Sequence, residues 1–280
     1  MAPSAPLSPW SHGERPLSAS TSMNSGVYFV RDDDIGDLTD ALVFFVELFV
    51  SRRIPVSYQI IPARLTEECA EYLLGVQRAH PDLIEFGQHG LRHCLELPGG
   101  RMVKREFGPE RSAQQQFEDI LEGKRLLDER LKGAPVKVFT PPQHKYNRDT
   151  VAAAAKAGHR VFSAADYATG IHQFVYSMGR SVGLSSIQGR GISYNGAVRP
   201  EAEIFERSIS IAVDNGRSIS IKPDDLEAKV RRARRKNDAV GFMLHHACYD
   251  KERGALTKIA DRMAGLGAQD FVKLGDLAPA

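Results

Sequence analysis

Short apolar runs alternate with amphipathic helical patterns from residue 27 almost to the C-terminus, and this alternation most constrains the fold. Residues 27–30 (VYFV) are apolar without a polar alternation, which is typical of a strand covered on both faces. Further strands are predicted at 56–61, 83–86, 136–139, 161–162, 240–244 and 271–274. Helices are predicted between them at 37–54, 66–79, 109–132, 149–157, 223–236 and 256–264. This order predicts a parallel sheet with helices outside, either an α/β barrel or a doubly wound open sheet, and we favour the barrel.

Two segments stand apart from this pattern. Residues 1–24 are rich in Ser and Pro and contain the only tryptophan, so we expect a disordered tail followed by one catalytic domain over residues 25–280. Residues 165–222 show no clear period and contain only strand-like pieces at 208–213 and 218–221. The sequence predicts no element boundaries there.

Composition excludes several classes of protein and partner. With 42% hydrophobic and 26% charged residues, the chain is neither fibrous nor wholly disordered. A net charge of +2 indicates neither a nucleic acid nor a membrane as partner, and the most apolar run, 41–50, is far shorter than the ~20 residues of a membrane span. Three cysteines without a CxxC pair, and no signal-like start, predict a cytoplasmic protein. The oligomeric state is left open.

Polar, chemistry-bearing residues follow four of the predicted strands. The segment RDDD at 31–34 follows the first, HGLRH at 89–93 the third and TPP at 140–142 the fourth, while HH at 245–246 follows the strand that ends at Leu244. Because the carboxyl ends of the strands of a parallel barrel meet on one face, we expect these segments to share one pocket.

The spacing of two histidines suggests a metal site. On a helical turn, His89 and His93 would lie on one side, where they can bind a divalent ion with Asp34 as the third ligand. Zinc suits two imidazoles and a carboxylate, and three protein ligands leave a position where water is acidified towards a pKa of ~7, which predicts a hydrolase. The alternative is a pair of surface or capping histidines.

The remaining charged residues suggest an acid and a base. Asp33 can serve as a base while Asp34 binds metal, with Arg31 steadying the cluster, although a solvated turn that caps the next helix is the alternative. His245 and His246 precede Asp250, and a carboxylate neighbour raises the pKa of a histidine towards that of a general acid. A buried structural histidine is the alternative for each of them.

Taken together and in order, four segments resemble the motifs of the polysaccharide deacetylase family, the NodB-homology carbohydrate esterases. They are 31–35 (RDDDI), 89–93 (HGLRH), 139–142 (FTPP) and 242–245 (FMLH). The resemblance implies a distorted (β/α) barrel and metal-dependent hydrolysis of an N- or O-acetyl group on a sugar. It implies the following roles: Asp33 as base, Asp34, His89 and His93 as metal ligands, His245 as acid with His246 as the alternate, and Thr140, Pro141 and Pro142 at the substrate.

The sequence also departs from the family pattern. Gly90 stands where Ser or Thr is common, and Thr140 and Gln143 stand where an arginine and an aromatic residue are usual, so Arg31 is expected to replace the missing arginine. We therefore expect zinc, with cobalt, manganese or nickel as alternatives, and an acetylated sugar or a related small amide or ester as substrate. The competing hypotheses are an inactive glycan-binding homologue and, with less support, a metal-dependent nuclease or phosphoesterase.

Overall fold

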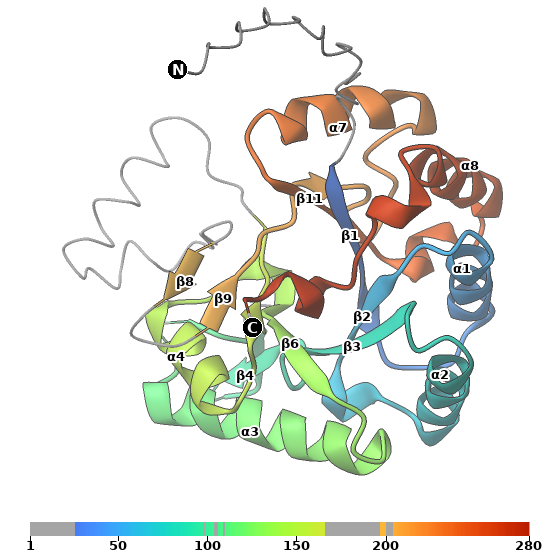
Figure 1. Cartoon of the computed structure of the whole chain (residues 1–280). Helices are drawn as coiled ribbons and strands as arrows, with labels where there is room; N and C mark the ends of the chain where they lie inside the picture. The colour runs from blue at the N-terminus through green and yellow to red at the C-terminus, as the bar shows by residue number, and fades with distance from the viewer. Residues whose placement is uncertain are drawn as a thin grey trace, which may run out of the picture.

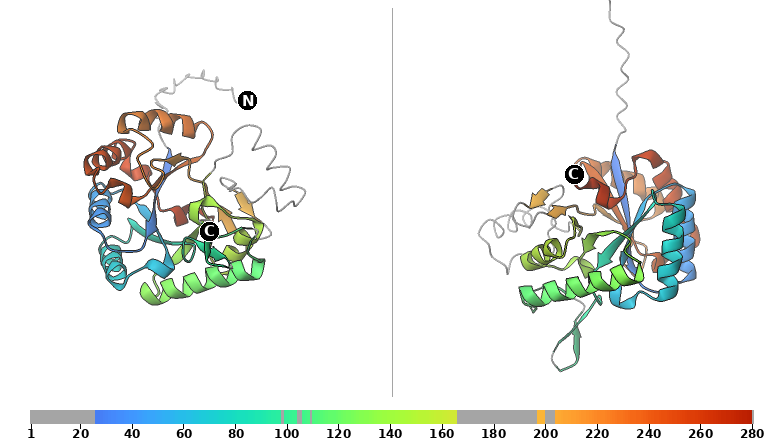
Figure 2. Two further views of the ribbon diagram at one scale, coloured as in Figure 1. Left: turned by 180° about the vertical axis from the view of Figure 1, so that it is seen from behind. Right: turned by 60° about the horizontal axis from the view of Figure 1, so that its bottom comes forward.

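The computed structural model describes residues 26–97, 99–103, 106–108, 110–165, 197–199 and 204–279. The tail predicted at 1–24 and much of the stretch 165–222 lie outside these residues. Figure 1 shows strands at the centre and helices around them, and Figure 2 gives the same arrangement from behind and from below. Alternating strands and helices therefore produce the predicted α/β architecture.

One curled sheet forms the centre of the described part of the chain. Its nine strands follow the order β10-β11-β1-β2-β3-β6-β7-β9-β8, and all neighbours are parallel except β8 and β9. The eight parallel strands form a half-barrel that places their carboxyl ends on one side. The strands are β1 (Val27–Ile35), β2 (Val56–Ile60), β3 (Ile84–His89), β6 (Val136–Thr140), β7 (Val161–Phe162), β8 (Ala197–Arg199), β9 (Ile204–Glu206), β10 (Ile211–Ala212) and β11 (Ala239–Leu244).

A separate antiparallel hairpin joins β4 (Leu95–Leu97) to β5 (Arg101–Val103), and it projects away from the body in the right-hand view of Figure 2. It begins two residues after His93, between the strand predicted at 83–86 and the helix predicted from 109, where the sequence predicted no strand. The chain then returns to the body through residues 106–108. This excursion brings Glu106 back to the segment that follows β3.

Helices cover the outside of the sheet (Figure 1). Several begin at a side chain that accepts a backbone N–H of the first turn, as Thr39, Thr66, Ser112 and Asn147 do. The long helix predicted from 109 therefore starts only after its Ser112 cap. The helices are α1 (Asp40–Ser51), α2 (Glu67–Ala79), α3 (Ala113–Arg130), α4 (Arg148–Lys156), α7 (Leu226–Arg234) and α8 (Arg253–Ala264).

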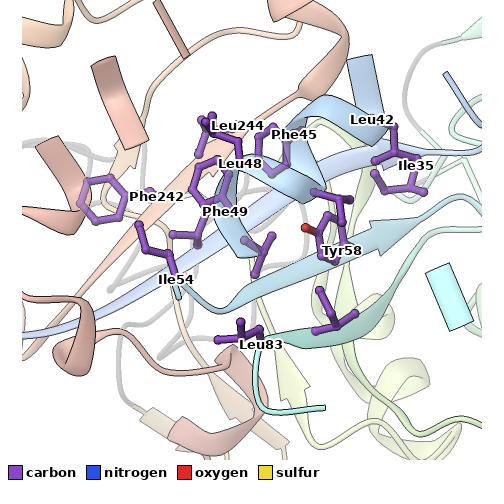
Figure 3. Close-up of a cluster of buried hydrophobic side chains, with 14 of the residues drawn as sticks. Ile35, Leu42, Phe45, Leu48, Phe49, Ile54, Tyr58, Leu83, Phe242 and Leu244 are labelled. Atoms are coloured by element: carbon purple, nitrogen blue, oxygen red, sulfur yellow. The ribbon is translucent and has the colours of Figure 1, made fainter. Parts of the chain in front are cut away.

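The largest part of the core lies between these helices and the sheet. Figure 3 shows Phe45 and Phe49 of α1 in one cluster with Tyr58 of β2. The two phenylalanine rings stack with centroids 4.4 Å apart, and Phe45 meets the Tyr58 ring edge-on at 6.3 Å. Each of these aromatic side chains is fully buried, which contributes roughly 1.5–3 kcal/mol of hydrophobic free energy. The most apolar run of the sequence is thus a buried helix face. In the described ranges, no helix has both the length and the hydrophobicity to cross a bilayer.

The strand predicted at 271–274 is wrong. Phe271 forms only a single bridge to Tyr28, and the chain then turns into a 3₁₀ helix at Leu274–Leu277. The backbone N–H of Gly275 donates to the Glu85 carboxylate at 2.9 Å, which holds this turn against the sheet in place of a strand ladder.

Candidate active site

The four strand-end segments meet in one place, as the positional argument predicted. Asp34 lies at the end of β1 and His89 is the last residue of β3, while His93 and His245 follow β3 and β11. Asp34 Oδ1 is 3.2 Å from His89 Nε2 and 3.0 Å from His93 Nε2, and Asp34 Oδ2 is 3.9 Å from His245 Nε2. Residues separated by more than two hundred positions therefore surround one carboxylate.

Irregular backbone puts these side chains in place. The ladder between β1 and β2 is interrupted between Asp32 and Ile35, and Asp34 has a left-handed φ of 68°. His93 also has a φ of 68°, and Gly90 before it has a φ of 63°. The helical turn assumed for the two histidines is wrong, because a left-handed turn after β3 brings them together instead. Left-handed non-glycine residues of this kind concentrate at functional sites.

The three side chains fit a bound divalent metal. Their ligand atoms all lie within 4.8 Å of one another, and Asp34 Oδ1 is a buried oxygen with no hydrogen-bond partner. Tetrahedral zinc, with bonds of about 2.0–2.2 Å, separates its ligand atoms by about 3.3 Å, which is close to the spacing seen here. Burial alone would raise the pKa of Asp34, but the two histidines lower it well below its ordinary value, so the carboxylate is ionised and ready to bind a cation.

Thr140 and Gln59 fix the tautomer of His89. His89 and Thr140 are register partners on β3 and β6, and His89 Nδ1 lies 2.8 Å from Thr140 Oγ1 and 3.2 Å from Thr140 O. A carbonyl oxygen can only accept, so Nδ1 carries the proton and Nε2 keeps its lone pair towards Asp34. The Thr140 hydroxyl donates onward to Gln59 Oε1 at 3.1 Å. Such partners orient the ligands of metal sites.

Thr140, predicted at the substrate, is fully buried with its hydroxyl engaged by His89, and Pro141 and Pro142 are buried beside it. Pro142 lies against Gly90, where an added Cβ would come within 2.6 Å of its ring. The substrate-binding role of these three residues stays a prediction.

Arg31 and Asp33 form a buried ion pair beside Asp34. Arg31 Nη2 and Nε donate to the two carboxylate oxygens at 2.6 and 3.1 Å, while Nη1 donates to the carbonyl and hydroxyl of Ser163 at 2.9 and 2.8 Å. Burial alone would raise the pKa of Asp33, but the Arg31 charge and then His89 lower it to about 2. Asp33 is therefore ionised and held in a fixed orientation by a bidentate fork.

His245 is paired with Asp214. Its Nδ1 lies 2.6 Å from Asp214 Oδ1, and its backbone N–H donates to Asp214 Oδ2 at 2.9 Å. Burial lowers the pKa of His245, but the hydrogen bond to Asp214 and the charges of Asp33, Asp214 and Asp34 raise it to about 9. The imidazole is thus protonated at neutral pH. The sequence-based pairing with Asp250 is wrong, because Asp250 is exposed and the buried Asp214 takes that place.

His246 is bound to a different carboxylate. Its backbone N–H donates to Asp32 Oδ1 at 2.8 Å and its Nδ1 lies 3.1 Å from Asp32 Oδ2, with both side chains buried. Asp32, Asp33 and Asp34 are consecutive in the sequence. Each of these three carboxylates nevertheless has a different partner, which is a histidine or an arginine. The alternate acid role of His246 stays a prediction.

Sequence reasoning missed Asp214 and His144. Asp214 follows the strand-like piece at 208–213, so the strand-end argument itself would have selected it. His144 follows β6, and its Nδ1 accepts the Ala165 N–H at 3.2 Å. Burial, together with the Arg31 charge, lowers its pKa to about 3, which makes it a neutral imidazole next to the charged pair.

Solved structures share this architecture at low sequence identity. No family model matches the sequence, and the search of curated proteins gave no match. A family 4 acetyl xylan esterase from Clostridium thermocellum, in complex with cobalt, aligns with a TM-score of 0.55 at 12% identity over 90% of this chain and 89% of its own. The chain has the fold of the family 4 carbohydrate esterases. The corresponding domain of a xylanase from the Trinervitermes trinervoides hindgut metagenome gives 0.53 at 12% identity over 91% and 90%.

The distorted barrel and the resemblance noted in the sequence are thereby confirmed at the level of the fold. A Bacillus anthracis protein described as a pseudoenzyme of the same family aligns with a TM-score of 0.52 at 11% identity, covering 91% of this chain and 66% of its own. The family 4 esterase fold therefore occurs with and without activity. Activity on this fold therefore depends on which side chains the site contains.

Proposed function

We propose that this protein is a metal-dependent hydrolase that removes an acetyl or similar acyl group from a sugar or a related amide. The observation that carries the proposal is the Asp34, His89 and His93 group, flanked by an ionised Asp33 and a protonated His245. The likeness of the fold to acetyl xylan esterases and deacetylases supports it.

Asp34, His89 and His93 would hold the metal, and zinc suits two imidazole nitrogens and one carboxylate, with cobalt, manganese or nickel as alternatives. When bound, such an ion supplies Lewis acidity to the acyl carbonyl and lowers the pKa of water. The tautomer set by Thr140 leaves His89 Nε2 available for it.

Asp33 and His245 divide the proton transfers between them. Asp33, ionised at neutral pH, accepts a proton from the attacking water, and Arg31 keeps its carboxylate oriented. His245, protonated at neutral pH, donates a proton from Nε2 to the departing nitrogen or oxygen, while Asp214 holds its Nδ1. Two titratable groups whose environments drive their pKa values apart, to about 2 and about 9, form a matched base and acid.

An inactive glycan-binding protein is the second candidate, because Thr140 occupies the position where the family motif usually has an arginine. The structure gives a reason to prefer the enzyme. Arg31, two residues before Asp33 on the same strand, makes the bidentate contact with the carboxylate. Arg31 can therefore orient Asp33 in place of the arginine that is usual in the family, which supports an active enzyme.

Metal analysis and acetate release test the proposal together. We expect one divalent ion per chain and release of acetate from acetylated amino sugars or nucleotide sugars. Asp34→Ala and His89→Ala should lose metal and activity, whereas Asp33→Asn should keep the metal and lose turnover. The exposed Asp37→Asn and the α2-terminal His80→Ala serve as matched controls. Full metal content and full turnover in the Asp34 and His89 variants would reject the proposal.

A further inference from the structure

A buried carboxylate outside the proposed catalytic set holds the segment between the two metal-ligand histidines. Glu106, 2% exposed, accepts the backbone N–H groups of Leu91 and Arg92 with Oε1 at 3.0 and 2.8 Å, and that of His93 with Oε2 at 3.1 Å. One side chain thus satisfies three consecutive backbone donors. Three N–H groups that converge on one carboxyl group form a directional arrangement.

The segment that Glu106 holds would not adopt this shape on its own. His93 has a left-handed φ of 68°, which costs a non-glycine residue free energy unless its surroundings enforce it. Gly90 has a φ of 63°, and an added Cβ there would lie 2.1 Å from Glu106 Oε2 and 2.6 Å from Pro142 Cγ. The absence of a side chain at Gly90 is therefore what lets the carboxylate reach the backbone.

The other side of the segment is fixed independently. Gln88 Nε2 donates to Gly90 O at 3.0 Å and to Ile120 O of α3 at 2.9 Å, and the carbonyl of Leu91 accepts the Ala63 N–H at 3.0 Å. These contacts anchor the carbonyl groups, and Glu106 anchors the N–H groups. Of these contacts, only the Glu106 bond reaches the backbone of His93 itself.

We infer that Glu106 is a positioning residue for metal binding, which holds His93 in its left-handed conformation so that His93 Nε2 faces Asp34 before the metal arrives. This inference rests on the proposed function, because it assigns a supporting role at the same metal site. It also explains the glycine at position 90, because any side chain there would clash with the Glu106 carboxyl group.

Glu106→Gln is the decisive variant. The amide keeps the size of the side chain but has only one accepting oxygen, so its NH₂ group faces at least one of the three N–H donors. Glu85→Gln is the matched control, because Glu85 is also a carboxylate that accepts a backbone N–H, from Gly275, but that contact belongs to the C-terminal 3₁₀ turn rather than to the histidine segment. Both variants lose a carboxylate–backbone contact, and only one of them touches the metal site.

Three measurements compare the variants. Chelator competition gives the affinity for Zn²⁺ alone, and the visible spectrum of the Co²⁺-loaded protein reports the ligand geometry. Amide hydrogen exchange of residues 91–93 is measured in the metal-free protein. We expect Glu106→Gln to bind Zn²⁺ about 10–100-fold more weakly, as is usual for losses around metal ligands, with an altered Co²⁺ spectrum and faster exchange. Glu85→Gln should match the wild type in all three. If Glu106→Gln does not fold, Glu106→Asp, which keeps the charge but is too short for all three contacts, should show the same changes.

The outcomes separate the two claims. Wild-type Zn²⁺ affinity and exchange rates in a folded Glu106 variant overturn the inference while leaving the proposed function intact. A wild-type protein that binds no Zn²⁺ overturns the proposed function, and the inference with it. Equal losses in the Glu106 and Glu85 variants would show a general loss of stability and would also overturn the inference.

Discussion

Replacing Arg31 by methionine tests the buried ion pair between Arg31 and Asp33. Arg31 is fully buried and donates to both oxygens of Asp33 and to Ser163, so Arg31→Met leaves a buried carboxylate without its countercharge. Breaking a buried ion pair in this way costs about 3–5 kcal/mol. The lowered pKa of Asp33 gives a second value: its displacement from 3.8 to about 2 corresponds to about 2–3 kcal/mol at neutral pH, at about 1.4 kcal/mol per pH unit.

The lowered pKa of Asp33 determines how the stability of the protein changes with pH. A carboxylate with a depressed pKa contributes stability above its unfolded pKa of 3.8, and that contribution disappears as the pH falls through about 2. Burial raises the pKa of Asp33, and the Arg31 charge is the main factor that lowers it. We therefore expect the pKa of Asp33 to rise above 3.8 in Arg31→Met. The acid limb of kcat/KM against pH should therefore move to higher pH, and the free energy of unfolding at pH 7 should fall by about 2–5 kcal/mol.

Denaturant unfolding and a pH–rate profile of acetate release measure the two effects. Arg52→Met is the matched control, because Arg52 forms an ion pair with the largely exposed Asp261 and should cost no more than about 1 kcal/mol. Arg31→Lys, which keeps the charge but not the fork, should lie between the wild type and Arg31→Met. An Arg31→Met protein with an unchanged acid limb and unchanged stability would show that Arg31 neither keeps Asp33 ionised nor stabilises the fold.

Three further predictions concern the acid, the ligand tautomer and the core. Asp214→Asn removes the partner that raises the pKa of His245 to about 9, so the alkaline limb of the kcat profile should move down by at least one pH unit; an alkaline limb that stays near pH 9 would contradict the assignment. Thr140→Val removes the hydroxyl that orients His89, and chelator competition should show roughly tenfold weaker Zn²⁺ binding. Phe45→Ala opens a cavity in the main core and should cost about 3–5 kcal/mol in denaturant unfolding, with unchanged metal affinity per folded molecule.

The architecture and the grouping of Asp34, His89 and His93 could be predicted from the sequence, because both depend on strand periodicity. Uninterrupted apolar runs specified buried parallel strands, and the carboxyl end of each strand then indicated where Asp34 and His89 would meet. The same rule holds for Asp214, but the surrounding stretch shows no clear period, so the sequence does not reveal the strand before it. His245 was consequently paired with the nearest carboxylate in the sequence, Asp250, instead of the nearest in space.

Other features depend on contacts that a linear pattern does not contain. The left-handed turn at His93 is specified by Gly90 and by Glu106, thirteen positions further on, rather than by local propensity. The proposed strand at 271–274 had suitable residues, but the Gly275 N–H is taken by Glu85 from a distant part of the chain. Tertiary contacts override local preference in both cases.

X-ray absorption spectroscopy of the Zn²⁺-loaded wild type and of His93→Ala can show whether Asp34, His89 and His93 bind one ion. We expect one ion per chain with two imidazole nitrogens and carboxylate or water oxygens at about 2.0–2.2 Å, and the loss of one imidazole in the variant. A zinc spectrum without imidazole ligands, or one that His93→Ala leaves unchanged, would contradict this expectation.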